Sequence, residues 1–323
     1  MQKVYKMEHT ERFAEDVREG LSSEPKYLHS KYFYDEIGDD LFQQIMELEE
    51  YYLTDCEAEI FESQKNVILQ YFSNGVEVFD LIEFGAGDGL KTKILLNHFV
   101  DNNINFNYIP IDISNSVLSS LTQDLNNNLP ELNIKPICDD YFHALEELNK
   151  VDYNKKVILF LGSNIGNFRG DDAIPFLKHL RADMKEKDQL FIGFDLMKDP
   201  KVILVAYNDK KGITSEFNFN LLDRINKDLG ANFNLKNFSH YPSYNPVTGE
   251  TKSYLISLKN QTVRIEELSQ SFTFKKWEPV FTEISQKYSL RDIKHFAKHS
   301  GFKVEKNFLD QKKYFVDSLW HLA

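Results

Sequence analysis

The hydrophobic and polar positions of this chain alternate between two regular patterns. Runs of consecutive apolar residues, each of strand length, are followed by polar or glycine-rich residues and then by segments with apolar positions at helical spacing. The runs lie at 78–84, 106–113, 134–137, 156–161 and 189–196, and the helical segments at about 90–99, 117–127, 172–186 and near Ala144. Because helices cover both faces of a parallel sheet, its strands are continuous apolar runs. The pattern therefore predicts an α/β fold with a mostly parallel, doubly wound sheet.

The pattern changes toward the C-terminal end. A helical segment at 290–298 precedes two apolar runs, at 302–309 and 314–320, which are close enough in sequence to form an antiparallel pair. A parallel sheet that ends in such a hairpin is typical of the class I methyltransferase fold, which is Rossmann-like.

The remaining segments suggest a second, smaller part. We expect a methyltransferase core of residues 71–198 and 284–323. Residues 1–70 are mainly helical and are predicted to form part of a substrate site. An insertion at 199–283 is predicted to form a smaller α+β substrate-binding lid. Its two apparent strands lie at 237–244 and 254–258.

The turn after the first strand carries the candidate chemistry. Gly85, Gly87 and Gly89 separate the strand from the following helix, so a ligand can approach the backbone and the first N–H groups of the helix. An ordinary strand-to-helix turn is the alternative. Asp112 ends the next strand about twenty residues later, where an acid accepts hydrogen bonds from ribose hydroxyls. The spacing G-x-G-x-G departs from the dinucleotide pattern, which disfavours a dehydrogenase and favours a cofactor without phosphates, such as S-adenosylmethionine.

Composition and charge narrow the class of protein. The 323 residues, 42% of them hydrophobic, can bury a large core. The formal net charge of −12 disfavours nucleic acid and anionic membranes as partners. Cys56 and Cys138 are too few for a disulfide framework, which suits the cytoplasm, and no apolar segment is long enough to span a membrane. His295 and His299 lack a third ligand, so no metal site is expected.

Several ordered segments together resemble the histidine Nα-methyltransferase family of ergothioneine biosynthesis. They include KYFYDEIGDDLFQQI, EYYLTDCEAEI, PIDIS, FLGSNIGNF, DLMKDP, AYND, EFNFNLLDRIN and FTEIS, at 31–45, 50–60, 110–114, 160–168, 195–200, 206–209, 216–226 and 281–285. The resemblance implies transfer of methyl groups from S-adenosylmethionine to the α-amino group of L-histidine, three times in succession. It implies a small-molecule substrate and no obligate protein partner.

The resemblance also implies a cofactor site. Gly85 and Gly87 would contact the methionine tail of S-adenosylmethionine, with Lys91 nearby, and Asp112 would bind the ribose. The helix macrodipole opposes a lysine in the first turn of a helix, so a carboxylate partner would explain Lys91. Asp140 and Tyr141 would hold the adenine.

A substrate site is implied in the same way. Asn167 and Tyr207 would bind the carboxylate of the amino acid, while Tyr34 and the turn at Asn167 would lie at the reacting amine and act in catalysis. Tyr51, Glu283 and Ser285 would contact the imidazole ring. Residues two apart on a strand share a face, so Glu283 and Ser285 can act together.

One position departs from the family. Ser253 stands where the family has a methionine against the substrate ring, so a larger or wetter ring pocket is expected, with Tyr254 or Leu255 able to fill the same space. A tryptophan-type or modified-histidine substrate is therefore an alternative. Another alternative is a protein that binds the cofactor without catalysis, although such a protein has no need of the substrate-facing residues.

Overall fold

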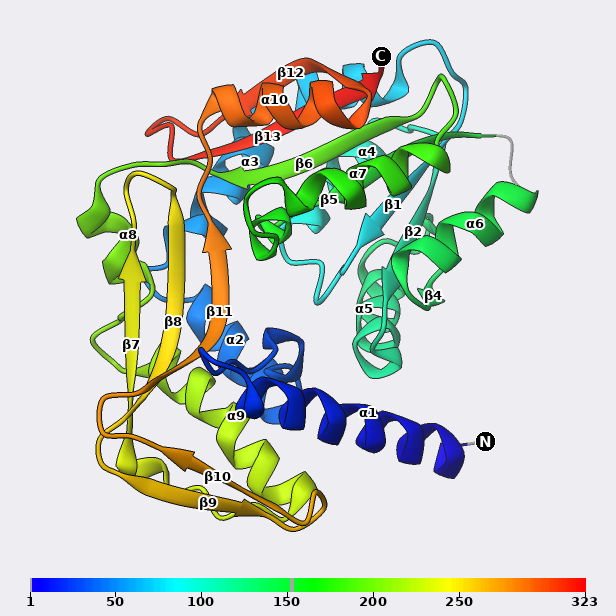
Figure 1. The fold of residues 1–323 in the computed structure, drawn as a ribbon. Coiled ribbons are helices and arrows are strands. Elements are labelled where there is room, and N and C mark those ends of the chain that lie inside the picture. The colour runs from blue at the N-terminus through cyan, green and yellow to red at the C-terminus, as the bar shows by residue number, and fades with distance from the viewer. Residues whose placement is uncertain (1, 152–153) are drawn as a thin grey trace. The chain divides into compact units, whose positions relative to one another are not determined.

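The computed structural model describes residues 2–151 and 154–323, which form two compact units (Figure 1). The small unit comprises residues 1–52 and 198–285, and the large unit comprises residues 53–197 and 286–323. The N-terminal segment 1–70, expected as one piece, is thus divided. Its last part belongs to α3 (Tyr52–Ser73), which packs on the sheet of the large unit through the rings of Phe61 and Phe72 against Phe191.

An eight-stranded sheet forms the centre of the large unit. Its strands follow the order β12-β13-β6-β5-β1-β2-β3, and β4 also pairs with β2. The neighbours β6, β5, β1 and β2 are parallel, whereas β13 is antiparallel to both β6 and β12. This order is that of the class I methyltransferase fold, so the predicted fold is confirmed. The strands are β1 (Phe79–Phe84), β2 (Phe106–Asp112), β3 (Asn133–Ile134), β4 (Ile137–Cys138), β5 (Lys155–Phe160), β6 (Gln189–Asp195), β12 (Phe302–Leu309) and β13 (Phe315–Leu322).

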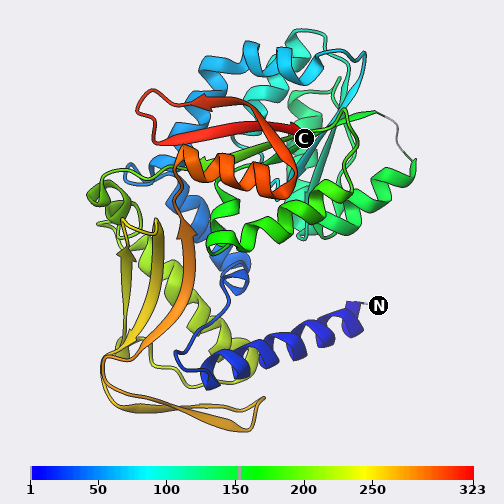
Figure 2. The ribbon, with the colours of Figure 1, turned by 45° about the horizontal axis from the view of Figure 1, so that its top comes forward.

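Helices cover both faces of this sheet (Figures 1 and 2). Apolar residues of α6, α7 and α10 pack with Ile82 and Ile158 in one core. Phe79 points to the opposite face, because side chains alternate along a strand, and it contacts Phe72 of α3 and Phe99 of α4. The helices are α4 (Thr92–Asp101), α5 (Asn115–Asn128), α6 (Tyr141–Val151), α7 (Ala173–Ala182) and α10 (Leu290–Ser300), with short 3₁₀ turns at Asn164–Asn167 and Gly170–Asp172.

Two elements of the large unit differ from the prediction. The strand expected at 134–137 is divided into β3 and β4, because Pro136 has no N–H to continue the ladder. The helix expected at 172–186 ends at Ala182. Beyond it, Asp188 accepts hydrogen bonds from the backbone N–H groups of Lys185 and Lys156, at 2.8 Å each, and so closes a turn into β6.

The small unit has more structure than the sequence predicts. The insertion contains a three-stranded sheet in the order β11-β8-β7 and a separate hairpin of β9 and β10. The two strands predicted there correspond to β7 and β8, whereas β9, β10 and two helices of the insertion were missed. The elements are α1 (Gln2–Ser22), α2 (Glu36–Met46), α8 (Pro200–Ala206), α9 (Ile213–Leu229), β7 (Phe238–Tyr244), β8 (Glu250–Ser257), β9 (Gln261–Ile265), β10 (Gln270–Phe274) and β11 (Pro279–Gln286), with 3₁₀ turns at Ser30–Tyr32 and Leu235–Asn237.

Helix α9 organises the core of the small unit. Its residues Phe217 and Leu221 are buried together with Leu255 of β8 and with Phe13 and Val17 of α1. None of the helices in the described part of the chain combines the length and hydropathy that a transmembrane span requires.

The N-terminus of α10 offers a test of local stability. Ser289 accepts a hydrogen bond from the backbone of Asp292, whose carboxylate accepts one from the backbone of Ser289, which is a complete capping box. We expect Ser289→Ala to lower the free energy of unfolding by about 1 kcal/mol, because the backbone N–H of Asp292 in the first turn loses its side-chain partner. Urea denaturation of the purified protein measures the change.

Ser119→Ala, in the exposed interior of α5, is the matched control. Alanine has the higher helix propensity, so this change should leave the free energy of unfolding unchanged or slightly raised. Equal losses in the two variants would contradict the role of the capping box.

Candidate functional site

The glycine turn after β1 leaves space beside its backbone. Gly85, Gly87 and Gly89 have φ values of 66°, 55° and 66°, in the left-handed region that favours glycine. A Cβ on Gly85 would lie 2.9 Å from the hydroxyl oxygen of Tyr141. A Cβ on Gly87 would meet no described atom within 4 Å. The turn is therefore conformationally restricted to glycine, and it is open to a ligand at Gly87.

Asp112 lies against this turn, as its position in sequence predicts. One carboxylate oxygen accepts a hydrogen bond from the backbone N–H of Gly87 at 3.3 Å, and the other from that of Ser114 at 2.9 Å. The parallel pairing of β1 with β2 brings the two segments together, since parallel strands end at the same edge of a sheet. A carboxylate is thus held in place beside the glycine turn.

Tyr141 forms one wall of the same region. Its ring stacks on that of Phe84, with centroids 4.6 Å apart and an interplanar angle of 2°. Burial, with a smaller contribution from the charge of Asp112, raises the pKa of Tyr141 to about 12. The phenol therefore stays protonated at neutral pH and presents a hydrogen-bond donor beside Gly85.

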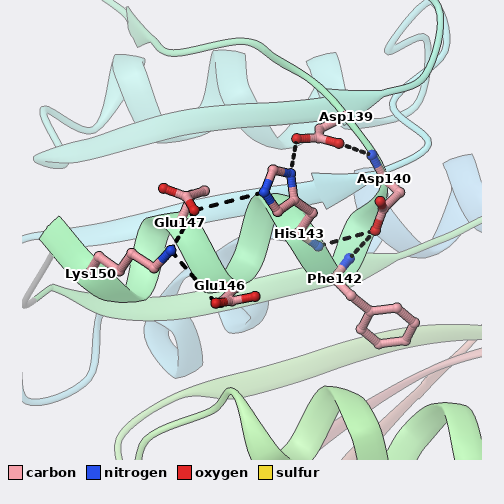
Figure 3. Close-up of polar contacts among 7 residues, drawn as sticks. All are labelled: Asp139, Asp140, Phe142, His143, Glu146, Glu147 and Lys150. Carbon is pink, nitrogen blue, oxygen red and sulfur yellow. Dashed lines mark hydrogen bonds and ion pairs between the residues drawn. The ribbon is translucent and has the colours of Figure 1, made fainter.

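Asp140 caps the helix that follows (Figure 3). Its Oδ1 atom accepts hydrogen bonds from the backbone N–H groups of Phe142 and His143, both at 3.1 Å, at the start of α6. Asp139 accepts a hydrogen bond from the backbone of Asp140 at 2.8 Å and also contacts the ring of His143, whose pKa it raises. Asp140 is therefore fixed by the helix terminus.

Lys91 has a carboxylate partner inside the protein. Its ammonium group forms an ion pair with Glu57 of α3, which also accepts a hydrogen bond from the backbone N–H of Gly162 at 2.9 Å. Burial alone would lower the pKa of Lys91, but the charge of Glu57 and the hydrogen bond to it raise that pKa.

Glu57 is not among the residues predicted from the sequence. The available signal is its helical spacing: it shares a face with Leu53, Ile60 and Phe61, all of which are buried. A charged residue in the apolar stripe of a helix needs a partner, because a buried unpaired charge is costly.

Asn167 lies at the end of the 3₁₀ turn that follows β5, at the carboxyl end of the sheet in the large unit. Its side chain is exposed. The neighbouring Gly166 is buried, and a Cβ there would lie 3.0 Å from the carbonyl oxygen of Gln286. Close backbone packing therefore fixes the turn that carries Asn167.

The small unit brings four predicted substrate residues into one connected group. The ring of Tyr34 contacts that of Phe42, with centroids 5.7 Å apart, and Phe42 contacts Tyr51 at 6.4 Å. Tyr51 in turn contacts Tyr207 at 6.4 Å. The hydroxyl of Tyr207 donates a hydrogen bond to that of Ser285 at 2.8 Å. Residues from separate segments of the chain thus meet in this unit.

Strand β11 presents Glu283 and Ser285 on one face. The residues between and beside them, Thr282 and Ile284, are buried on the other face. Thr282 Oγ1 lies 3.0 Å from the carbonyl oxygen of Ser253 in β8.

Ser253 itself does not share the face of Glu283. It is buried on the same face as Leu255, which packs in the core with α9. Its contact with the substrate ring stays a prediction that depends on strand register, because a shift of one residue moves a side chain to the opposite face of a sheet. Tyr254 is the neighbour on the partly exposed face, and its ring contacts Phe281 at 5.9 Å.

Comparison with known proteins identifies the family. The profile described as histidine-specific methyltransferase, SAM-dependent, matches residues 13–322. The chain belongs to this family. The histidine N-alpha-methyltransferase of Mycolicibacterium smegmatis is 34% identical, over 88% of this chain and 86% of its own length. Ergothioneine biosynthesis protein 1 of Schizosaccharomyces pombe is 29% identical, over 86% of this chain and 36% of its own length. The L-tryptophan methyltransferase of Psilocybe serbica is 26% identical, over 92% of this chain and 89% of its own length.

The large unit of this histidine-specific methyltransferase suits the family's cofactor, S-adenosylmethionine. The turn at Gly87 is open, Asp112 offers acceptor oxygens for hydroxyl groups, and Lys91 offers a cation for a carboxylate. The residues present therefore fit an adenosyl amino acid.

Glu83 makes the stability of this unit depend on pH. It is buried in β1 and accepts hydrogen bonds from the side chains of Thr92, at 2.6 Å, and Tyr108. Burial raises its pKa from 4.5 to about 7, against the opposing effect of these bonds; Lys91 and Glu57 are the charged groups that face it. The folded state therefore binds a proton on Glu83 more tightly than the unfolded state does. The stability that this proton contributes to the folded state is lost as the pH rises from about 4.5 through 7.

Glu83→Gln removes this titration. We expect the free energy of unfolding of the wild type, relative to that of the variant, to fall between pH 5 and pH 8 by on the order of 2 kcal/mol. Urea denaturation at the two pH values measures the difference. A difference that stays constant with pH would show that Glu83 does not titrate in this range.

Proposed function

We propose that this methyltransferase transfers methyl groups from S-adenosylmethionine to the α-amino group of L-histidine, three times in succession, to give the trimethylated betaine. Family membership supports the reaction and the cofactor. The observation that carries the assignment of the substrate is the hydrogen bond from Tyr207 to Ser285, beside Glu283 on the same strand face. A protein that only binds the cofactor does not need this arrangement.

In this proposal the large unit binds the cofactor. Gly85, Gly87 and Lys91 take the methionine tail and Asp112 takes the ribose, while the adenine is held by Asp140 and Tyr141. When bound, S-adenosylmethionine supplies a methyl group that its positive sulfur already activates. The residues therefore need to position the reactants rather than form a covalent bond to them.

The substrate residues orient the amine. Asn167 and Tyr207 bind the carboxylate of histidine, and Tyr34, whose ring is held edge-on against Phe42 and Phe217, accepts a hydrogen bond from the amine. These residues would hold the neutral amine with its lone pair toward the methyl group that bound S-adenosylmethionine would supply, with S-adenosylhomocysteine as the leaving product. After each of the first two transfers the new ammonium group would lose a proton to water near Tyr34, whereas the third transfer gives a quaternary ammonium with no proton to lose. No fixed acid is needed, so the growing ammonium group can rotate between rounds.

Two groups with different chemistry bind the ring of the substrate. A carboxylate at Glu283 accepts a charge-assisted hydrogen bond from an imidazole N–H. Tyr207 donates to Ser285 in the structure. When Tyr207 donates its single proton to the substrate carboxylate instead, the serine hydroxyl donates to the second ring nitrogen. Tyr51 contacts Tyr207 and completes the aromatic wall on that side.

A tryptophan-type substrate is the second candidate, because a relative of this chain is an L-tryptophan methyltransferase. An indole has an N–H for Glu283 but no ring nitrogen that accepts a hydrogen bond, so it leaves Ser285 without its partner. Histidine satisfies both groups.

We further propose that the enzyme acts in the cytoplasm on a free amino acid. Cys56 and Cys138 are both free thiols, as expected in a reducing compartment. The net charge of −12 disfavours nucleic-acid and membrane partners.

Mass spectrometry of products tests the reaction. Purified protein is incubated with S-adenosylmethionine and with histidine, tryptophan or other aromatic amino acids separately. We expect a histidine product heavier by three methyl groups. Methylation of tryptophan but not of histidine would retain the cofactor site and overturn the assigned ring contacts. A protein that binds cofactor but methylates no amino acid would support the non-catalytic alternative.

The role of Asp112 gives a binding prediction. Asp112→Ala should raise the dissociation constant of S-adenosylhomocysteine about tenfold or more, because a charge-assisted hydrogen bond to the ribose is lost. Calorimetry measures the constant. Asp124→Ala, which removes an exposed acid paired with Lys93, should leave it unchanged. Unchanged affinity in Asp112→Ala would place the ribose elsewhere.

The role of Glu283 gives a substrate prediction. Glu283→Ala should weaken histidine binding about tenfold or more, while the affinity for S-adenosylhomocysteine stays near that of the wild type. The matched control is Glu267→Ala, at an exposed turn of the same unit. If histidine affinity is the same in both variants, the ring does not contact Glu283.

A further inference from the structure

A buried group of charged side chains lies behind the cofactor turn of the large unit. It comprises Glu57 of α3, Glu83 of β1, Asp317 of β13 and Lys91, which precedes α4. Glu57 and Asp317 are 0% exposed and Glu83 is 4% exposed. These side chains point to the sheet face that α3 and α4 cover. The proposed cofactor contacts account for Lys91 but not for the acids around it.

Glu57 connects two segments that border the cofactor turn. Its carboxylate pairs with the ammonium group of Lys91 and accepts the backbone N–H of Gly162, which lies 2.9 Å from one oxygen and 3.1 Å from the other. Lys91 follows the glycine turn after β1, and Gly162 follows β5, the parallel neighbour of β1. A single carboxylate thus joins the carboxyl ends of the two central strands.

The sheet has space reserved for this carboxylate. A Cβ on Gly193 of β6 would lie 2.5 Å from Oε1 of Glu57, which is closer than a carbon and an oxygen can approach. Gly193 pairs with Asp317 across the antiparallel β6–β13 ladder. The absence of a side chain at this position therefore allows Glu57 to reach the end of the sheet.

The charges of the group identify Glu57 as the partner of Lys91. Burial raises the pKa of Asp317 well above its ordinary value, and the neighbouring Glu57 raises it further. The carboxylate of Glu83 is engaged by the hydroxyls of Thr92 and Tyr108. Glu57 is therefore the acid that balances the ammonium charge.

We propose that Glu57 is a positioning residue for the cofactor: it holds the ammonium group of Lys91 and the loop at Gly162 in place to receive the carboxylate of the cofactor's amino-acid tail. The proposal rests on the proposed function. A lysine has a flexible stem, and the macrodipole of α4 opposes its charge, so an unsupported Lys91 would neither stay charged nor stay in place.

A double-mutant cycle tests whether Glu57 acts through Lys91. The variants are Glu57→Gln, Lys91→Met and the combination, and calorimetry with S-adenosylhomocysteine gives each dissociation constant. We expect about a tenfold increase for Glu57→Gln, a similar or larger one for Lys91→Met, and no further increase when the first change is added to the second. If the increases of the two single variants multiply in the double variant, the proposal is overturned, because Glu57 then acts independently of Lys91.

The dependence on pH provides a readout that loss of packing does not change. Without Glu57, burial lowers the pKa of Lys91, although Glu83 and Asp317 also face it. The ratio of the dissociation constants of Glu57→Gln and wild type should therefore rise several-fold from pH 7 to pH 9. Titration of the ligand's own amino group affects both dissociation constants equally, so it cancels in their ratio. A ratio independent of pH would contradict the proposal.

Two further variants control for folding. Glu57→Asp keeps the charge but draws the carboxylate back by one methylene. Its affinity for S-adenosylhomocysteine should therefore fall, while the ratio of its dissociation constant to that of the wild type should not change with pH. Glu62→Gln, at an exposed position of the same helix, should match the wild type. If Glu57→Gln does not fold, a Glu57→Asp variant with wild-type affinity would overturn the proposal.

The outcome is separable from that of the proposed function. If the wild type binds S-adenosylhomocysteine and methylates histidine but the cycle is additive, only the proposed role of Glu57 is refuted. A wild type that does not bind S-adenosylhomocysteine refutes both.

Discussion

The parallel pairing of β1 with β2 on one side and β5 on the other is the constraint on which the large unit depends. Parallel neighbours end at the same edge, so segments distant in sequence converge there: the glycine turn after β1, Asp112 after β2 and Gly162 after β5. Each segment contributes a different chemical group, namely open backbone, a carboxylate and an N–H. The sheet order, rather than any local sequence, places these groups within reach of one ligand.

The accuracy of the sequence-based predictions follows from the range of the interactions involved. The glycine turn and Asp112 were predictable because strand, turn and helix signals are local and the spacing between them is regular. Glu57 was not, because its partners Lys91 and Gly162 are 34 and 105 residues away in sequence. The role of Ser253 could not be predicted as firmly, because a shift of one residue in a strand register exchanges the buried and the exposed face.

The two units differ in how they hold their polar groups. In the large unit the buried carboxylates of Glu57 and Glu83 are held by a backbone N–H group, hydroxyls and a lysine. In the small unit the proposed substrate residues are mostly aromatic and are joined by ring contacts, with the Tyr207–Ser285 hydrogen bond at one end. Rigid polar positioning suits a cofactor of constant shape. A mainly aromatic wall with few polar anchors suits a substrate amine that gains bulk during the reaction.

The small unit is built from two segments of chain, 1–52 and 198–285, which lie on either side of most of the large unit in sequence. Phe13 and Val17 of α1 share a core with Leu221 of α9, about two hundred residues later. During synthesis the N-terminal segment therefore emerges long before the helix that covers its apolar face. Until that helix is made, this segment has only its own residues to pack against, such as Phe13 on Tyr32. The small unit therefore completes folding late, and its N-terminal helices are exposed to proteases and chaperones in the meantime.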